Sequence, residues 1–238
     1  MQTADGPEPG ASAPEPSRRR GTHASPRAAS RATRQLLMQT AERLFGQHGI
    51  EGISLREIGT EAGQSNNNAV QYHFETRENL VASILEWRVT SMEPRRSTML
   101  ADLEKSGRSS DAKSLLSVLC LPHLDLAAPD GSYPFTRFLL LYIYRYRQRG
   151  MPHPFDRIPA QTPALAQTIA LLYRRLHNFP KPLAHFRMTT CVAMFMNAIV
   201  MSEAQANPFE GDLTRPQMVA DVLEMMTTAL LAPAAPQP

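Results

Sequence analysis

The chain of 238 residues has only two cysteines and one tryptophan. Cys120 and Cys191 are far apart and lie in apolar segments, so we expect two buried free thiols rather than a disulfide framework. No uninterrupted apolar run reaches the ~18 residues that span a bilayer, and the N-terminus lacks the apolar stretch of a secretory signal. These absences predict a soluble, cytoplasmic protein with no membrane partner.

Residue groupings typical of catalysis or metal binding are also missing. The sequence has no Gly-rich phosphate loop, no serine elbow and no pair of carboxylates at active-site spacing. His123 lies near Cys120 and His185 near Cys191, but zinc needs three or four ligands at short spacings. We therefore expect no catalytic residue, no metal and no cofactor, and we keep an enzyme as the weak alternative.

Positive charge is concentrated at the start of the chain. The net charge is only +3, but residues 17–34 hold six arginines and no acid. Residues 1–30 are rich in Pro, Ala, Ser and Gly, and cannot bury enough apolar surface to offset the entropy of ordering. We therefore expect a disordered basic arm over residues 1–30. Arginines on such an arm can enter a DNA minor groove, although a solvated tail explains the composition equally well.

Residues 54–74 predict two short helices separated by a tight turn. Ser54 and Glu57 have the capping-box spacing that starts a helix. Gly63 suits the left-handed conformation that ends one. The second helix has an apolar inward stripe, formed by Ala69, Val70 and Phe74.

The outer face of the second helix is polar. Ser65 or Asn66 is expected to cap its start. Amide side chains can pair with base edges, and Tyr72 and His73 can donate to phosphate oxygens, as on a helix that lies in a major groove. A solvated helical hairpin is the alternative interpretation. The candidates for base contacts are Asn66, Asn67, Asn68 and Gln71.

These helices lie within a longer ordered set of residues. The set comprises Ala41, Leu44-Phe45, His48-Gly49, Ser54-Leu55-Arg56-Glu57-Ile58, Ala62-Gly63, Tyr72-His73-Phe74, Arg77-Glu78 and Leu80. Over roughly residues 33–87 it resembles the DNA-binding domain of the tetracycline-repressor (TetR) family of bacterial transcriptional regulators. Two departures, Gln64 in place of an apolar residue and the amide-rich residues 66–68, leave the base sequence open.

The resemblance implies a three-helix DNA-binding domain over residues 31–90. A first helix is expected from Thr33 to His48, and the family's contacts to the DNA backbone fall on its N-terminus and on the first turn of the helix after the motif. The candidates for phosphate contacts are Thr33, Arg34, Arg56, Ser65, Tyr72, His73 and Arg77.

Beyond residue 90 only helical periodicity guides the prediction. A long helix is expected from Thr76 to about Glu104, with Pro94 kinking or ending it. Further helices are expected over residues 112–126 (broken by Pro122), 134–148, 163–179, 181–207 and 216–232, with a loop over 150–163. The whole is an all-α protein of about nine helices, with a helical ligand-binding and dimerisation domain over 91–232 and a flexible tail over 233–238.

The last two expected helices are apolar around most of their circumference. Such helices need cover on several sides, which a two-fold partner can supply. In the family these helices form the dimer interface, so the interface candidates are Phe195, Ile199, Val219, Leu223 and Met226.

The resemblance also implies a homodimer that represses transcription from a near-palindromic operator and is released by a small, largely apolar effector. Tyr142, Tyr144, Tyr146, His153 and His177 could line a pocket or belong to a solid core, so the ligand-binding residues stay unassigned. A DNA-binding or protein-docking module with no ligand is the main alternative.

Overall fold

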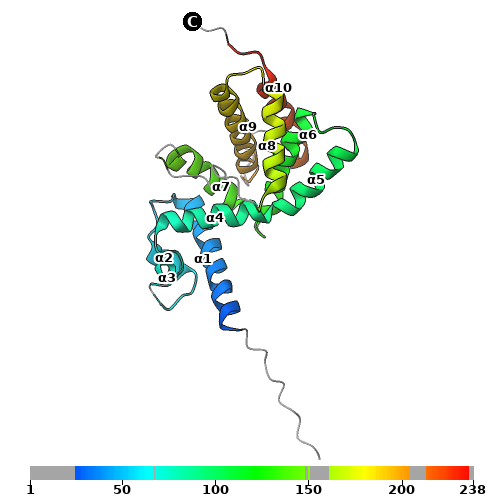
Figure 1. Ribbon diagram of the computed structural model, residues 1–238. Helices are drawn as coiled ribbons and strands as arrows, with labels where there is room; N and C mark the ends of the chain where they lie inside the picture. Colours follow the sequence, from blue (N-terminus) through cyan, green and yellow to red (C-terminus); the bar gives the residue numbers. More distant parts are fainter. Residues whose placement is uncertain (1–24, 67, 148–149, 151–160, 204–212, 236–238) are drawn as a thin grey trace, which may run out of the picture.

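The computed structural model describes residues 25–66, 68–147, 150, 161–203 and 213–235. Over these residues the protein is all-α, with no strand, which confirms the predicted fold class (Figure 1). Ten α-helices and two short helices of other types follow one another: α1 Pro26–His48, α2 Leu55–Glu61, α3 Ala69–Phe74, α4 Arg77–Ser91, α5 Glu93–Lys105, α6 Ala112–Cys120, the 3-10 helix η1 Leu121–Leu126, α7 Pro134–Leu141, the π-helix η2 Tyr142–Tyr146, α8 Pro163–Arg175, α9 Lys181–Met201 and α10 Arg215–Leu231.

The first helix begins earlier than predicted. α1 starts at Pro26 rather than at Thr33, because Ser25 caps it through Ala28 N–H and Pro26 occupies the first turn, where no N–H is needed. The prediction of a disordered arm reaching residue 30 is therefore wrong from Pro26 onward; residues 1–24 lie outside the described part. On α1, the apolar side chain of Leu36 faces outward and is 42% exposed.

The long helix expected from Thr76 is divided in two, which raises the helix number by one. α4 ends at Ser91, and α5 starts at Glu93 with Pro94 in its first turn. Pro94 has no N–H to donate to the preceding turn, so the regular α-helical ladder cannot run through it. Pro94 thus ends one helix and starts the next.

Of the first four helices, α1 packs against α7. Phe45 on α1 stacks on Phe138 on α7, with ring centroids 6.0 Å apart. A Cβ at Gly46 would lie 3.0 Å from the carbonyl oxygen of Pro134, so the glycine permits the close approach of the two helices. One buried cluster therefore joins α1–α4 to the second half of the chain.

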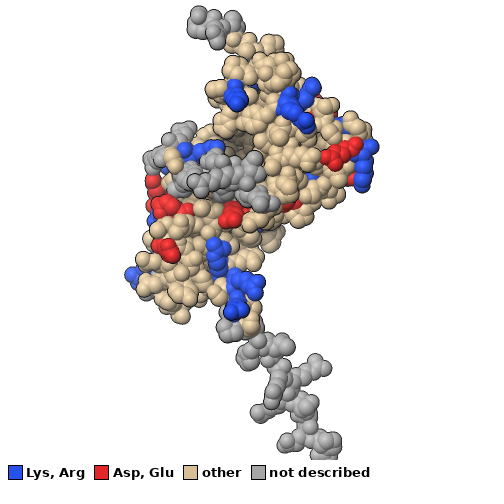
Figure 2. Space-filling model, in the orientation of Figure 1, with Lys and Arg blue, Asp and Glu red and all other residues tan. Residues whose placement is uncertain are grey.

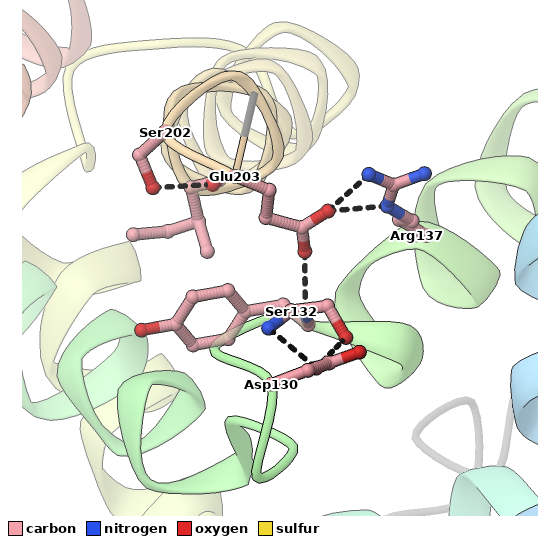
Figure 3. A network of polar contacts seen from close by, with 7 residues as sticks. Asp130, Ser132, Arg137, Ser202 and Glu203 are labelled. Atoms are coloured by element: carbon pink, nitrogen blue, oxygen red, sulfur yellow. Dashed lines mark hydrogen bonds and ion pairs between the residues drawn. The ribbon is translucent and has the colours of Figure 1, made fainter. Parts of the chain in front are cut away.

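The N-terminus of α7 is fixed by a carboxylate that follows α9 (Figure 3). Glu203 accepts hydrogen bonds from the backbone N–H of Tyr133 and from the Arg137 guanidinium, and only 3% of its side chain is exposed. Next to it, Asp130 accepts from the backbone and hydroxyl of Ser132. This network attaches the end of α9 to the start of α7.

The remaining elements agree with the predicted ranges to within a few residues. Pro122 follows the end of α6, and Pro163 occupies the first turn of α8, both as expected. α8 stops at Arg175 and α9 at Met201, before their predicted ends. Cys120 and Cys191 are buried free thiols, as predicted, and burial raises the pKa of Cys120 to about 12.

The predicted dimer-interface residues face the core of their own chain. Four of the five are between 0% and 5% exposed, so they do not form a surface: Phe195, Ile199, Leu223 and Met226. Val219 is partly buried against the same cluster. The prediction chose the wrong face of both helices, because periodicity alone cannot say which of two apolar faces meets the chain's own core.

The opposite face of the last two helices is apolar and exposed. Phe186 and Met201 on α9 are 65% and 54% exposed, and Met225 on α10 is 53% exposed. Together with neighbouring side chains they border a groove of about 780 Å³. We call this surface the α9–α10 face.

Candidate nucleic-acid interface

The candidate interface is built on α2 and α3, which lie side by side at one end of the molecule (Figure 1). The hydroxyl of Ser54 accepts from Glu57 N–H at 3.1 Å, and the Glu57 carboxylate accepts from Ser54 N–H at 2.7 Å. This is the predicted capping box, and its hydrogen bonds lower the pKa of Glu57. It fixes where α2 begins.

Gly63 makes the turn between α2 and α3. Its φ of +68° lies in the left-handed region, which a residue with a Cβ enters at a cost. Gly63 N–H donates to Thr60 and Gln64 N–H to Gly59, so the last carbonyls of α2 are paired. The Gln64 side chain donates to the Ala62 carbonyl, so this unusual residue serves the turn.

The second helix begins later than predicted. α3 starts at Ala69, and the Asn66 side chain accepts from Asn68 N–H at 2.9 Å in the segment before it. Asn66 and Asn68 therefore lie in the turn that leads into α3 instead of on the outer face of the helix, and Asn67 lies outside the described residues. Asparagine favours such turns because its side chain bonds to nearby backbone, a preference that competes with helix formation.

The short helix α3 has the predicted division into two faces. The buried residues are Ala69, Val70 and Phe74, as expected. Gln71 is exposed, Tyr72 is 79% exposed, and His73 is half-buried with its pKa lowered by burial and by Arg34. Gln71 and Tyr72 are thus accessible to a ligand as large as a DNA duplex.

Arg34 does not lie at a helix N-terminus, because α1 begins eight residues earlier. Its guanidinium donates to the Ser83 hydroxyl at 2.8 Å and stacks 4.7 Å from the centroid of Phe74. Arg34 therefore connects α1 to α3 and α4. Thr33 is also inside α1 and half-buried, so the helix-end reason for expecting phosphate contacts there is wrong for both residues.

The other phosphate candidates fall into two groups. Arg56 and Ser65 are exposed beside α3, and Arg56 has no polar partner among the described residues. Arg77 is half-buried and donates to the carbonyl of Ile50, so at least part of its guanidinium holds the loop between α1 and α2. Arg56 is the better placed of the two arginines for an external contact.

Sequence reasoning missed a basic stripe on the first turns of α1. Arg27 and Arg31 are exposed and share a helical face with Arg34, at spacings of four and three residues. Since Arg34 touches Phe74 of α3, the stripe extends from the side of α1 that faces the recognition helix. Figure 2 shows basic side chains gathered at this free end of α1. Had the Ser25–Pro26 pair been recognised as a helix start, the stripe could have been predicted.

A buried ion pair between α4 and α1 stabilises the helices on which α3 packs. Arg88 on α4 donates through two nitrogens to Glu42 on α1, at 2.5 and 2.6 Å. Burial raises the pKa of Glu42, and Arg88 opposes that shift. The pair attaches α4 to α1 and so fixes the position of the helices that contact α3.

Two short helices joined by a glycine turn, with the second exposing an amide and a phenol, form a helix-turn-helix of the DNA-binding class. Residues 37–84 match the family described as bacterial regulatory proteins, tetR family. The match supports placing the chain among the TetR-family DNA-binding transcriptional regulators, and it covers the N-terminal domain only. No curated protein matches the chain.

Two other observations bear on alternative functions. Among the described residues, no three His, Cys, Asp or Glu side chains are grouped so that they could hold a metal ion. α9 is long and apolar enough to cross a membrane, but a core helix of a soluble protein passes the same test. Here α9 packs against α7 and α10, and seven of its residues are buried.

Proposed function

We propose that the protein is a cytoplasmic repressor that binds a near-palindromic operator as a homodimer and is released by a small effector. The observation that carries the proposal is the exposed pair Gln71 and Tyr72 on the recognition helix of a TetR-family domain. Glutamine can bind adenine through two hydrogen bonds, and the tyrosine hydroxyl can donate to a phosphate. Asn66 and Asn68 approach DNA from the turn before α3.

The α9–α10 face supports the homodimer. A contiguous apolar surface on two adjacent helices is costly to leave in water, and a second copy would cover it by an isologous contact. In this arrangement Phe186, Met201 and Met225 replace the interface residues predicted from the sequence. Two recognition helices would then lie one DNA turn, about 34 Å, apart.

The basic stripe of α1 supports a contribution to affinity without base specificity. Arg27 and Arg31 carry charge that no acid in the first turn of α1 offsets. Each phosphate contact they make would add about 0.9 to the slope of log affinity against log salt. The double variant Arg27→Ala/Arg31→Ala should therefore lower that slope by up to about 1.8 and leave the preferred sequence unchanged.

A single selection experiment tests the DNA-binding proposal. Duplexes with a randomised centre are selected on the full-length protein, and the proposal expects an enriched site with two inverted halves. On that site Gln71→Ala should weaken binding by about 1–3 kcal/mol and by much less on random DNA. Gln167→Ala, which removes an exposed amide from α8, is the matched control and should leave both affinities unchanged.

Two results would contradict the proposal. The first is selection that enriches no sequence, and the second is a Gln71→Ala protein that binds the selected site as tightly as the unchanged protein. Sedimentation of the Phe186→Asp variant adds the oligomer test, because a charge on the α9–α10 face should yield folded monomers. If the unchanged protein is itself monomeric at micromolar concentration, the homodimer is excluded.

A DNA-binding module with no effector is the second candidate function. It differs only in the second half of the chain, where it requires no ligand site. The cavity described next favours a regulator that responds to a ligand.

A further inference from the structure

A cavity of about 180 Å³ lies behind the joint between α4 and α5. Its walls come from α4 to α9, and most of them are aliphatic or aromatic. The volume slightly exceeds the roughly 150 Å³ of an apolar cavity known to hold benzene in another protein. The cavity can therefore hold one six-membered ring with a small substituent.

Arg96 lies in the wall of this cavity and is 1% exposed. One terminal nitrogen donates to the Val89 carbonyl at 3.2 Å, and the other lies 3.5 Å from the sulfur of Met92. The Nε atom has no partner among the described residues. Burial lowers the pKa of Arg96 to about 10, so the side chain is still charged at neutral pH. A buried cation in this position requires a compensating anion.

Among the described residues, no carboxylate accepts a hydrogen bond from Arg96, although the charge of Glu93 acts on it from a distance and raises its pKa. Glu93, one turn earlier on α5, accepts from the backbone of Ala164 and Leu165 at the start of α8, so its oxygens are already engaged there. Arg96 lies in the cavity wall, and none of the described residues of that wall is acidic. The electrostatic field in the cavity therefore favours a negative ligand.

A second buried polar group points to the same chemistry. His123 is 6% exposed, stacks on Phe135 with centroids 5.8 Å apart, and has no partner at Nδ1 among the described residues. Burial and the nearby Arg96 lower its pKa to about 3, so the imidazole is neutral. A neutral imidazole can donate one hydrogen bond without adding a second charge. Arg96 and His123 are both unsatisfied in part, which is rare for buried groups and typical of a binding site.

We propose that this cavity binds a small monocarboxylate with an apolar body of about the size of benzoate, and that Arg96 receives the carboxylate. The assignment rests on the proposed function in that it names the chemical class of the effector. A guanidinium and a carboxylate form the strong, charge-assisted hydrogen bonds that the unpaired Nε lacks. The larger groove on the α9–α10 face is a weaker candidate, because Asp221 lies in its wall and the groove opens onto the surface assigned to the second copy.

The position of Arg96 also suggests how binding would reach the DNA. Through Val89, Arg96 caps the last turn of α4, the helix that packs on α3 at its other end. A carboxylate that draws the guanidinium into the cavity weakens this cap and loosens the joint at Met92. Since coupling is reciprocal, operator DNA should weaken the carboxylate by the same factor.

The experiment is calorimetric titration of the full-length protein, without DNA, with benzoate and with benzamide as its neutral counterpart. Benzoate should bind at least tenfold more tightly than benzamide, because only benzoate meets the charge of Arg96. Hexanoate, a flexible monocarboxylate, should also bind more tightly than hexanamide. Comparable affinities for acid and amide, or no binding of either acid at millimolar concentration, would overturn the proposal.

Two arginine variants then test whether Arg96 is the residue that receives the carboxylate. Arg96→Met keeps the length of the side chain and should lower benzoate affinity at least tenfold. Arg95→Met changes the neighbouring arginine, which is paired with Asp125 and lies outside the cavity wall, and should alter the affinity less than twofold. Thermal unfolding shows whether each variant is folded, and Arg96→Gln replaces Arg96→Met if the latter does not fold. Equal losses in the Arg95 and Arg96 variants would contradict the assignment.

Operator binding separates this inference from the proposed function. If benzoate binds through Arg96 but no DNA site can be selected, the carboxylate site stands and the repressor function fails. If a site is selected but acid and amide bind alike, the repressor function stands and the carboxylate site fails.

Discussion

The two halves of the protein differ in whether they bury unpaired polar atoms: among the described residues, such atoms occur only in the second half. In α1–α4 the buried carboxylate of Glu42 is fully paired by two hydrogen bonds from Arg88. In the second half, Arg96, His123 and Thr136 each bury a polar atom that has no partner among the described residues. The first half thus resembles a rigid scaffold that presents exposed groups. The second half bears the cost of unsatisfied groups, and two of them, Arg96 and His123, lie in the wall of a cavity.

This difference fits the two proposed roles, which are DNA recognition by the first half and a response to a ligand by the second. A paired and well-packed domain keeps the recognition helix in one orientation, which base contacts require. A domain with unsatisfied polar groups loses stability in the empty state and regains it when a ligand supplies the missing partners. The joint at Met92 lies between the two kinds of region.

The largest expected effect distinguishes the core face of α9 from its outer face. Phe195→Ala should lower the free energy of unfolding by about 3–5 kcal/mol, because it removes a fully buried ring and leaves a cavity. Phe186→Ala removes a ring that is 65% exposed in one chain and should cost less than about 0.5 kcal/mol at high dilution. Denaturant unfolding monitored by circular dichroism measures both.

Protein concentration provides the control for this pair. If the α9–α10 face is covered by a second copy, the cost of Phe186→Ala should grow as the concentration rises, while that of Phe195→Ala stays constant. If the cost of each substitution is instead the same at every protein concentration, small for Phe186→Ala and large for Phe195→Ala, no second copy covers the outer face.

A smaller effect concerns the unpaired imidazole. The folded-state pKa of His123 is about 3 and the unfolded value is 6.5, so the unfolded chain binds the additional proton in this window. Stability from this group is therefore present above pH 6.5 and is lost as the pH falls toward 3, by about 2 kcal/mol between pH 6.5 and 5. His123→Phe should remove this part of the pH dependence, as measured by unfolding at several pH values.

The exposed histidines offer a matched control. His177→Phe changes an exposed side chain and controls for the general effect of replacing a histidine by phenylalanine. A His123→Phe protein with the same slope as the unchanged protein would show that the imidazole is not buried in its neutral form.

The sequence predicted the first half better than the second for a physical reason. The capping box at Ser54, the turn at Gly63 and the inward stripe of α3 depend on contacts within a few residues, so local pattern suffices. Arg96 follows another arginine in a charged segment, and nothing local indicates that its side chain turns inward. Its burial depends on helices far along the chain.

The errors in the first half have a local origin too. Ser25 and Pro26 start α1 inside a segment whose composition predicts disorder, because capping outweighs composition at a helix end. The start of α3 is delayed because the Asn66 side chain accepts from the backbone N–H of Asn68 before the helix begins. The first error means that the candidate contacts at the start of α1 are Arg27 and Arg31 instead of Thr33. The second means that Asn66 and Asn68 lie in the turn before α3 instead of on the helix.

The smallest effect tests whether the turn of the helix-turn-helix is set by backbone conformation. Gly63→Ala forces a Cβ into the left-handed region at φ +68° and should destabilise the protein by about 1 kcal/mol, although no atom lies within 4 Å of the added carbon.

Gly59→Ala is the matched change one turn earlier, where the backbone is helical and the added Cβ meets only Val70 at an ordinary 3.7 Å. There alanine should be neutral or stabilise the protein by up to about 1 kcal/mol, because it favours the helix over the unfolded chain. Thermal unfolding of the two variants should thus shift in opposite directions. If both lower the stability equally, packing between α2 and α3 controls the turn, and the left-handed residue does not.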